Sequence, residues 1–236
     1  MEEIEGQVPL RRDRPAPGVL RLRLDRPERR NALDRPLIDA LLDAFAAPAE
    51  PVVVLGSTTP EAFCAGADLR LEDAERAGVS DLLYELYGRM TSSEAIVVAA
   101  LDGPAVGGGA QLAIAADLRV LARTARIRLA GPGHGLAVGA WGLPSLVGRG
   151  RAMDLCLTMR SVDAAEAHAI GLVDRIADDA AAAAVELAAG LAALDRAAAA
   201  RVKRVVWASA RALEALDVER TENNASWTGS MENARG

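Results

Sequence analysis

Three consecutive glycines, Gly107 to Gly109, lie between an apolar segment and a stretch expected to start a helix near Ala110. The N-terminus of a helix carries unpaired backbone N–H groups and the positive end of the helix dipole. Glycines at such a point allow an anionic or polarised oxygen to approach the bare amides. The stretch has neither the Lys-Ser/Thr of a phosphate-binding loop nor the G-x-G-x-x-G spacing of a dinucleotide site. A polarised oxygen is therefore favoured over a nucleotide as the ligand.

A second turn of small residues, FCAGADL at 63–69, follows another apolar run in the same manner. Two such turns can each direct a backbone N–H group at one carbonyl oxygen. This arrangement is an oxyanion hole, which stabilises a reaction that passes through an enolate or a tetrahedral oxyanion. The alternative is that the small residues serve only close packing between a strand and a helix. Both interpretations stay open on the residues alone.

Both turns are expected at the ends of buried strands in an α/β fold. Residues 18–27 alternate apolar and basic side chains as a half-buried strand does, whereas 51–58 and 95–103 are apolar runs typical of strands buried on both faces. A helix is expected over 31–48, with Asp34 as its N-cap and Pro36 in its first turn. Helical segments around 80–93 and 108–117 and a strand at 118–123 continue the alternation. This order indicates a mainly parallel sheet covered by helices.

From Asp163 onward the composition changes to helices rich in Ala, Leu, Arg and Glu. A short helix that stops at Gly171 and two long helices, over 179–194 and 196–216, are expected there. The chain is thus divided into an N-terminal tail, 1–17, a core, 18–162, and a helical C-terminal region of the same domain, 163–236. The last long helix is expected to carry more apolar residues on one side than one subunit would cover, namely Val202, Val205, Val206, Ala210 and Leu213.

Composition and charge argue against several classes of protein. The chain has 236 residues, 51% of them hydrophobic, and a formal net charge of −6. This length is enough to bury a core, and the acidic balance argues against nucleic acid, whose phosphates favour a basic surface. The two cysteines lie far apart in no metal-ligand spacing and indicate free thiols in a reducing compartment. With no apolar leader and no segment of membrane-spanning length, a cytoplasmic protein without a metal or a membrane partner is expected.

A family resemblance rests on four motifs: LDRPERRNALD at 24–34, FCAGADL at 63–69, DGPAVGGGAQLAIAAD at 102–117 and AHAIGLVDRI at 167–176. By these motifs the chain resembles the crotonase superfamily, that is, the enoyl-CoA hydratase/isomerase family. The resemblance implies a spiral of ββα units followed by a helical trimerisation region. It also implies an acyl-CoA thioester as ligand, with coenzyme A as part of the substrate and no separate cofactor. A homotrimer or a dimer of trimers is implied as well.

The resemblance assigns the thioester oxygen to two backbone amides, which are those of Ala67 and Gly108 in this sequence. It also implies that the segment around Arg29 and Arg30 lies near the CoA nucleotide, which makes both arginines candidate phosphate contacts. The alternative is that they are ordinary solvated arginines. The other residues expected around the acyl-CoA are Ala65, Asp68, Leu69, Arg70, Gly107 and Gly131.

The sequence departs from the family pattern at the residues that move protons. Hydratases of this family use two glutamates, because one carboxylate can act as base toward water and the other as acid toward carbon. Gln111 occupies the first position, and the second falls on Gly131 when counted without gaps or on Gly133 when the proline is matched. His134 is the nearest titratable candidate for acid–base work, although a loop histidine is more often a simple surface residue.

Two classes of function remain. The first is an enzyme in which Ala67 and Gly108 polarise the thioester and catalyse hydration, isomerisation, decarboxylation or thioester hydrolysis. The last two reactions depend less on a carboxylate base. The second class is a non-catalytic acyl-CoA-binding partner subunit that has kept the fold and lost its acids. Loss of both glutamates favours the second class, whereas the two intact turns are compatible with either.

Overall fold

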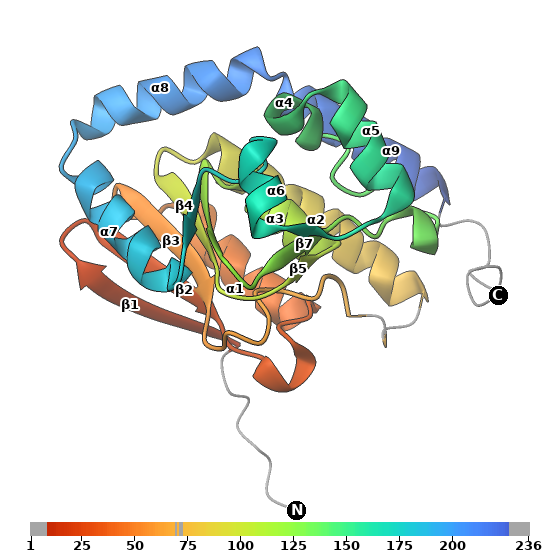
Figure 1. Cartoon of the computed structure of the whole chain (residues 1–236), viewed down its shortest axis with the longest axis horizontal. Helices are drawn as coiled ribbons and strands as arrows, with labels where there is room; N and C mark the ends of the chain where they lie inside the picture. The colour runs from red at the N-terminus through yellow and green to blue at the C-terminus, as the bar shows by residue number, and fades with distance from the viewer. Residues whose placement is uncertain (1–8, 69, 71–72, 227–236) are drawn as a thin grey trace, which may run out of the picture.

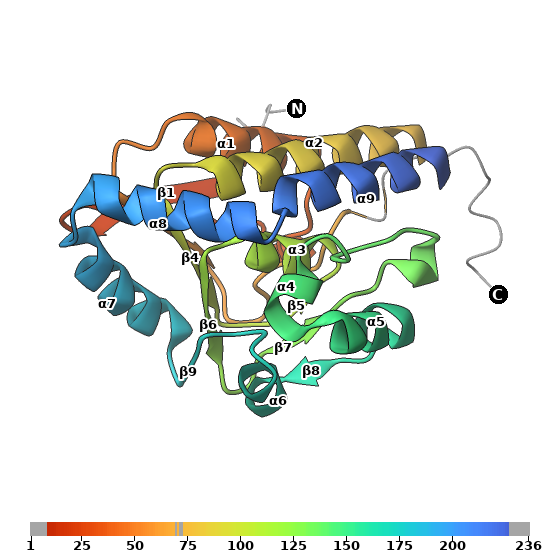
Figure 2. The same cartoon turned by 90° about the horizontal axis from the view of Figure 1, so that it is seen from above.

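The computed structural model describes residues 9–68, 70 and 73–226, and the described strands form two sheets. The larger sheet has the strand order β1-β2-β3-β4-β6-β9 (Figures 1 and 2). β1 is antiparallel to β2, and the other neighbours in this sheet run parallel, so the expected α/β fold with a mainly parallel sheet is confirmed. Its strands are β1 Leu10–Ala16, β2 Val19–Leu24, β3 Val52–Ser57, β4 Ile96–Leu101, β6 Leu118–Ala122 and β9 Arg175–Ala177.

Helices cover both faces of this sheet, which explains its continuous apolar strands. α7 (Ala180–Ala192) packs against β2, β3, β4 and β6, while α1 (Arg35–Ala46) and α2 (Asp73–Ser92) lie on the opposite side (Figure 2). The central strands β3 and β4 are buried along most of their length, because a parallel strand between two helical layers has no solvent-facing side. The expected N-cap of α1 is present, since the Asp34 carboxylate accepts a hydrogen bond from the N–H of Leu37 at 3.1 Å.

The smaller sheet contains, among the described residues, the strands β5 Ala105–Val106, β7 Arg126–Arg128 and β8 Val162–Asp163. β5 runs parallel to β7, and β7 runs antiparallel to β8. α3 (Gly108–Ala115) begins directly after β5, and α4 (Leu143–Val147), α5 (Arg149–Thr158) and α6 (Ala164–Ala169) follow later in the chain. Strands this short show no period in the sequence, and this sheet was therefore not expected.

The sheet begins before residue 18, the expected start of the core. β1 pairs with β2 in a register that joins Leu10 to Leu24 and Ala16 to Val19. Pro15 is tolerated in β1 because β1 is an edge strand, and one side of its backbone needs no partner. Residues 10–16 therefore belong to the core sheet and not to a tail.

The C-terminal region contains two helices, α8 (Arg196–Ser209) and α9 (Ala212–Ser226), in place of the single helix expected over 196–216. The chain turns between them at Arg211, which has φ +50°. This turn lets α9 lie along α2 (Figures 1 and 2). The buried face of α9 consists of Ala212, Leu216, Glu219 and Asn223, spaced three or four residues apart. None of the described helices is both long and apolar enough to cross a membrane.

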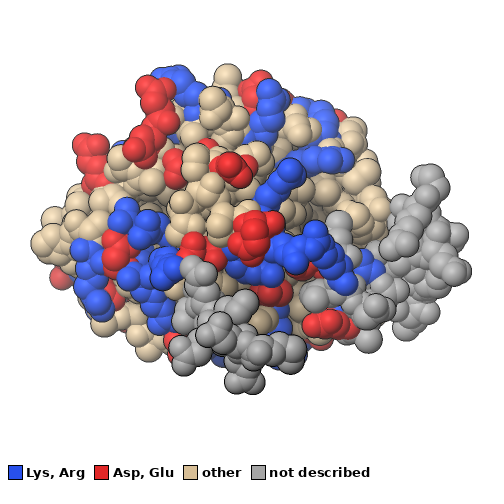
Figure 3. All heavy atoms as spheres, turned by 90° about the horizontal axis from the view of Figure 1, so that it is seen from below, with Lys and Arg blue, Asp and Glu red and all other residues tan. Residues whose placement is uncertain are grey.

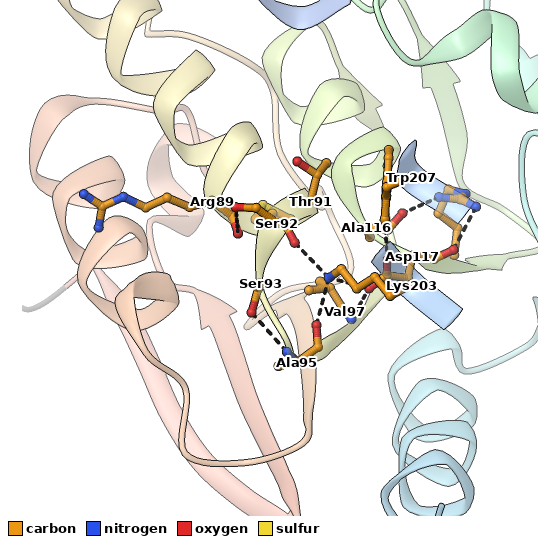
Figure 4. Close-up of polar contacts among 12 residues, drawn as sticks. Arg89, Thr91, Ser92, Ser93, Ala95, Val97, Ala116, Asp117, Lys203 and Trp207 are labelled. Carbon is orange, nitrogen blue, oxygen red and sulfur yellow. Dashed lines mark hydrogen bonds and ion pairs between the residues drawn. The ribbon is translucent and has the colours of Figure 1, made fainter. Parts of the chain in front are cut away.

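Lys203, the only lysine in the sequence, anchors α8 to the sheet. Its ammonium group donates hydrogen bonds to the carbonyl oxygens of Met90 at 2.9 Å and Ala95 at 2.8 Å, and it lies 2.8 Å from Oδ2 of Asp117 (Figure 4). The other oxygen of Asp117 accepts a hydrogen bond from the indole N–H of Trp207 at 2.6 Å. Burial lowers the pKa of Lys203, and the neighbouring carboxylate opposes this change. The pair ties the C-terminal helices to the start of β4 and to the connection between α3 and β6.

Candidate active site

The two turns of small residues that the sequence singles out meet in the structure. The N–H of Val106 donates a hydrogen bond to the carbonyl oxygen of Cys64 at 2.9 Å. A Cβ atom on Gly109 would lie 2.3 Å from the same oxygen, and one on Gly66 would lie 2.8 Å from the carbonyl oxygen of Val106. Backbone atoms thus exclude side chains at these two positions, and close packing accounts for both glycines.

The other two glycines of the triplet have different surroundings. Gly107 has φ +54°, a conformation that residues with a side chain rarely adopt. A Cβ atom on Gly108 would lie 3.3 Å from Cδ1 of Leu33 and 3.4 Å from the hydroxyl oxygen of Tyr87, which are the ends of side chains. The packing interpretation therefore explains Gly109, whereas backbone conformation explains Gly107 and neither accounts fully for Gly108.

The N–H groups of Ala67 and Gly108 have no hydrogen-bond partner among the described residues. Leu33 donates its N–H to the carbonyl oxygen of Gly66 at 2.8 Å, and Asp68 donates its N–H to the carbonyl oxygen of Leu33 at 3.0 Å. In this parallel bridge the N–H of Ala67 points away from Leu33. Gly108 is the first residue of α3, so its N–H has no acceptor within the helix. Neither N–H donates to another described residue, and both residues line the same cavity.

This cavity has a volume of about 410 Å³, which is within the range of small-molecule sites. Both turns, α2, the start of α3, the segment 128–138 and α9 contribute to its wall. The predicted site residues among its lining are Ala65, Ala67, Gly107, Gly108, Gln111, Gly131 and His134. The structure thus brings together residues from both turns and from the loop after β7.

The predicted charged residues do not line the cavity in the described part of the chain, and Leu69 lies outside the described residues. Arg29 is half-buried and Arg30 is exposed, at the end of the 3-10 turn Pro27–Arg29, and neither forms an ion pair with a described residue. Asp68 lies 3.7 Å from Arg26 and accepts a hydrogen bond from the N–H of Arg70 at 3.1 Å. On the face shown in Figure 3, arginine side chains are interspersed with Asp and Glu.

Gln111 is 4% exposed and still lines the cavity. Its Oε1 atom accepts a hydrogen bond from the indole N–H of Trp141 at 2.7 Å. Because an indole nitrogen is only a donor, this bond fixes which end of the amide faces Trp141. The amide nitrogen has no hydrogen-bond partner among the described residues, so its two N–H groups are available to a group in the cavity.

The space available for a side chain at the second expected acid position differs between its two alignments, Gly131 and Gly133. At Gly131 a Cβ atom would lie 2.4 Å from the carbonyl oxygen of Leu136 and 2.7 Å from Cβ of Val138, so no side chain fits there. At Gly133 the nearest atom would be the sulfur of Met159 at 3.2 Å, on a side chain that can move. A carboxylate at the first alignment would thus require a different path for the wall segment.

His134 is half-buried in the 3-10 turn Pro132–His134 and contributes to the cavity wall. Histidine is the side-chain type that ordinarily gains or loses a proton near neutral pH. No Asp or Glu is among the described residues that line the cavity. A general acid or base at the described cavity would therefore be this histidine or an ionisable residue that lies behind the lining residues.

Several residues of the cavity come from helices to which the sequence assigned no role. Tyr84 and Tyr87 of α2 and Asn223 of α9 line it. The Tyr84 hydroxyl donates a hydrogen bond to Oε1 of Glu219 at 3.0 Å and accepts one from Nδ2 of Asn223 at 2.6 Å. Burial raises the pKa of Glu219 to about 7. Glu219 and Asn223 are two polar residues on the otherwise apolar face of α9, and this pattern could have indicated their role from the sequence. The pattern was missed because the expected helix ended at residue 216.

The model of the family described as enoyl-CoA hydratase/isomerase matches residues 15–234 of the chain. The chain is 42% identical over 168 residues to the probable enoyl-CoA hydratase echA6 of Mycobacterium tuberculosis, with 68% of each chain covered. It is similar to the crystal structure of an enoyl-CoA hydratase/isomerase from Mycobacterium paratuberculosis, with a TM-score of 0.86 and 25% identity over 96% of both chains. It is also similar to a monofunctional enoyl CoA isomerase from M. smegmatis, with a TM-score of 0.74 and 32% identity over 89% of this chain and 99% of that one.

Proposed function

This chain belongs to the enoyl-CoA hydratase/isomerase family and has the crotonase-like fold, and on that premise we propose that it binds an acyl-CoA thioester with the carbonyl oxygen between the N–H groups of Ala67 and Gly108. The observation that carries the proposal is the presence of these two N–H groups, without partners among the described residues, at the wall of one cavity. Donors that are fixed before the reaction stabilise the negative charge that develops on the thioester oxygen.

Coenzyme A enters as part of the substrate, and we propose no further cofactor. Ala65 lines the cavity and donates its N–H to the carbonyl oxygen of Arg30 at 3.0 Å, so the backbone of Arg30 lies beside the cavity. Arg29 and Arg30 have no ion-pair partner among the described residues and are proposed to contact the phosphates of coenzyme A. Asp68 and Arg70 lie at the end of the same turn as Ala67 and complete the proposed binding region.

The proposed reaction depends on the oxyanion hole more than on a carboxylate. An amide such as Gln111 cannot exchange a proton near neutral pH, and no Asp or Glu is among the described lining residues. Decarboxylation and thioester hydrolysis need less from a side-chain base than hydration does. His134 is the proposed acid–base residue for hydration or isomerisation. The same lack of a lining carboxylate favours a second candidate, a non-catalytic acyl-CoA-binding subunit.

A panel of acyl-CoA thioesters, incubated with the purified protein and followed by mass spectrometry, tests the proposal. We expect binding of the thioesters by calorimetry and only slow gain of water by crotonyl-CoA. Loss of carbon dioxide from a carboxylated acyl-CoA would identify a decarboxylase, and release of free coenzyme A would identify a thioesterase. Binding without any change in mass would support the non-catalytic candidate. If no thioester binds, the proposed site is wrong, and rapid hydration would contradict the proposed roles of Gln111 and His134.

We also propose that the chain forms a trimer or a dimer of trimers. Val202, Val205, Val206 and Leu213 are more than half exposed, whereas Ala210 is partly buried against the core. The three valines lie on α8 and Leu213 lies on α9, and large exposed apolar residues on neighbouring helices are typical of an interface between subunits. Light scattering at micromolar concentration is expected to give three or six times the mass of one chain. A monomer under these conditions would contradict the proposal.

A further inference from the structure

Glu219 on α9 accepts hydrogen bonds from two other parts of the cavity wall. The hydroxyl of Tyr84 on α2 donates to its Oε1 atom at 3.0 Å. The N–H of Gly139 donates to the same oxygen at 3.2 Å, and the N–H of Trp141 donates to Oε2 at 2.8 Å. Glu219 is 4% exposed, so these donors take the place of water at its carboxylate. One residue of the C-terminal helix therefore joins α2 to the segment 139–141.

Asn223, one helical turn further along α9, extends this attachment. Its Oδ1 atom accepts a hydrogen bond from the N–H of Ala137 at 2.8 Å, and its Nδ2 atom donates to the carbonyl oxygen of Ala137 at 2.7 Å. The segment 137–141 thus has both of its ends bound to α9. Val138, between these ends, lines the cavity. This part of the wall is positioned by α9 through polar contacts.

Trp141 connects the segment 137–141 to Gln111 through a hydrogen bond. Its indole N–H donates to Oε1 of Gln111 at 2.7 Å. The indole ring stacks on Tyr87 with ring centroids 6.1 Å apart, and on Trp207 with centroids 6.4 Å apart. A buried ring in contact with two other aromatic rings has little freedom to turn once its backbone is fixed. The orientation of the Gln111 amide therefore depends on Glu219 through a single residue.

We propose that Glu219 is a positioning residue whose carboxylate holds the segment 137–141 and thereby sets the direction in which the Gln111 amide meets the acyl group. The inference rests on the proposed binding of acyl-CoA thioesters. The two backbone N–H groups bound to Glu219 can only donate, and an ionised carboxylate only accepts. A proton on Glu219 removes the charge that strengthens these bonds and adds an O–H group to which the backbone N–H groups offer no acceptor. The protonated residue holds the wall less firmly.

The ionisation of Glu219 falls in an accessible pH range. Burial raises its pKa to about 7, although the hydrogen bonds from Trp141 and Tyr84 lower it. The described ionisable groups on the surrounding elements include Tyr84, Tyr87, Asp81 and Arg76 on α2, Cys156 on α5, Arg220 and Glu222 on α9, and Arg128 and His134 in the cavity wall. Burial raises the pKa of both tyrosines and of the cysteine, which keeps them neutral near pH 7. Asp81 pairs with Arg220 at 2.8 Å.

Binding of hexanoyl-CoA and of free coenzyme A, measured by calorimetry from about pH 6 to about pH 8, tests this inference. The ionised form of Glu219 predominates at the alkaline end of this range. Because the ionised carboxylate forms stronger hydrogen bonds to the wall than the protonated group does, the affinity for hexanoyl-CoA is expected to rise about tenfold with pH. Coenzyme A carries the same phosphates but no acyl group, so it is the reference, and the tenfold rise is expected in the ratio of the hexanoyl-CoA affinity to the coenzyme A affinity. Glu219→Gln should remove the slope and bind hexanoyl-CoA as weakly as the natural protein does at the acidic end.

Matched variants separate Glu219 from its surroundings. Glu222→Gln removes the same charge from an exposed position of α9 and should keep the slope. His134→Gln should leave the midpoint of the profile in place. Tyr84→Phe removes a hydrogen bond that lowers the pKa of Glu219, so it should move the midpoint to higher pH.

A level profile in the natural protein, or a slope that survives Glu219→Gln, would overturn the role of Glu219 and leave acyl-CoA binding intact. If Glu219→Gln does not fold, the profile of the natural protein and the midpoint in Tyr84→Phe still decide the question. A midpoint that moves with His134→Gln and not with Tyr84→Phe would also overturn the inference. If hexanoyl-CoA does not bind at any pH, the proposed function fails together with it.

Discussion

Replacing Gly108 by valine is expected to lower the affinity for acyl-CoA thioesters about tenfold, because the loss of one hydrogen bond to the thioester oxygen costs about 1.5 kcal/mol. The γ-carbons of valine would stand beside the N–H group and obstruct the approach of a carbonyl oxygen. The new Cβ atom would lie 3.3 Å from Cδ1 of Leu33 and 3.4 Å from the hydroxyl oxygen of Tyr87. Both are ends of side chains that can yield by a few tenths of an ångström, so the fold should be kept. Calorimetry with hexanoyl-CoA and circular dichroism measure the two effects.

Gly78→Val provides the control for this variant. Gly78 lies in α2, and a Cβ atom there would meet nothing within 4 Å. The same side chain is thus added to a helix that contributes to the cavity wall, at an open position. Its affinity for hexanoyl-CoA should match that of the natural protein. A folded Gly108→Val variant that binds hexanoyl-CoA equally well would refute the proposed site.

The variant Lys203→Met is expected to lower the free energy of unfolding by about 3–5 kcal/mol, because removal of one partner of a buried ion pair leaves the other charge uncompensated. The side chain of Lys203 is 1% exposed, and that of its partner Asp117 is 12% exposed. The substitution also leaves the carbonyl oxygens of Met90 and Ala95 without the donor that they share. Urea unfolding followed by circular dichroism measures the change.

Two further variants test whether the loss comes from the buried pair. Arg204→Met removes a charge from the next residue of α8, whose side chain is 56% exposed and lies 3.8 Å from Glu94, and should change stability by less than about 1 kcal/mol. Adding Asp117→Asn to Lys203→Met removes the unpaired charge but also one of the two oxygens that accept from the N–H groups of Val97 and Trp207, so it should recover only a small part of the loss. If Lys203→Met unfolds within about 1 kcal/mol of the natural protein, the pair does not anchor α8 in the way described.

The sequence by itself determined the strands whose pattern of apolar residues shows which of their sides are buried. Apolar runs predicted β3 and β4, and alternation predicted β2, because a strand between two helical layers must be apolar on both sides and a half-covered strand on one. The N-cap at Asp34 was likewise a local feature, since the carboxylate bonds to an N–H three residues away. The short strands of the second sheet have too few residues to show any such pattern.

The sequence also located the two turns, since unpaired N–H groups at the start of a helix follow from local backbone geometry. That Gly66 and Gly109 are required by contact with Val106 and Cys64 became visible only when the turns were brought together. The predicted arginines Arg29 and Arg30 illustrate the limit. The backbone of Arg30 lies beside the cavity, but neither arginine side chain lines it. The direction of a side chain at the surface depends on a partner that the motif does not contain.

Only the tertiary structure decided how the C-terminal helices reach the cavity. Helix propensity continues from Val206 through Arg211, so the local sequence favours one helix, and packing of α9 along α2 outweighs it at the turn. The hydrogen bond from Tyr84 to Glu219 joins residues 135 positions apart in the chain. Periodicity shows which face of a helix is apolar, but it does not show which other helix covers that face. A polar residue such as Glu219 therefore acquires its partners, and its raised pKa, from contacts that exist only in the folded chain.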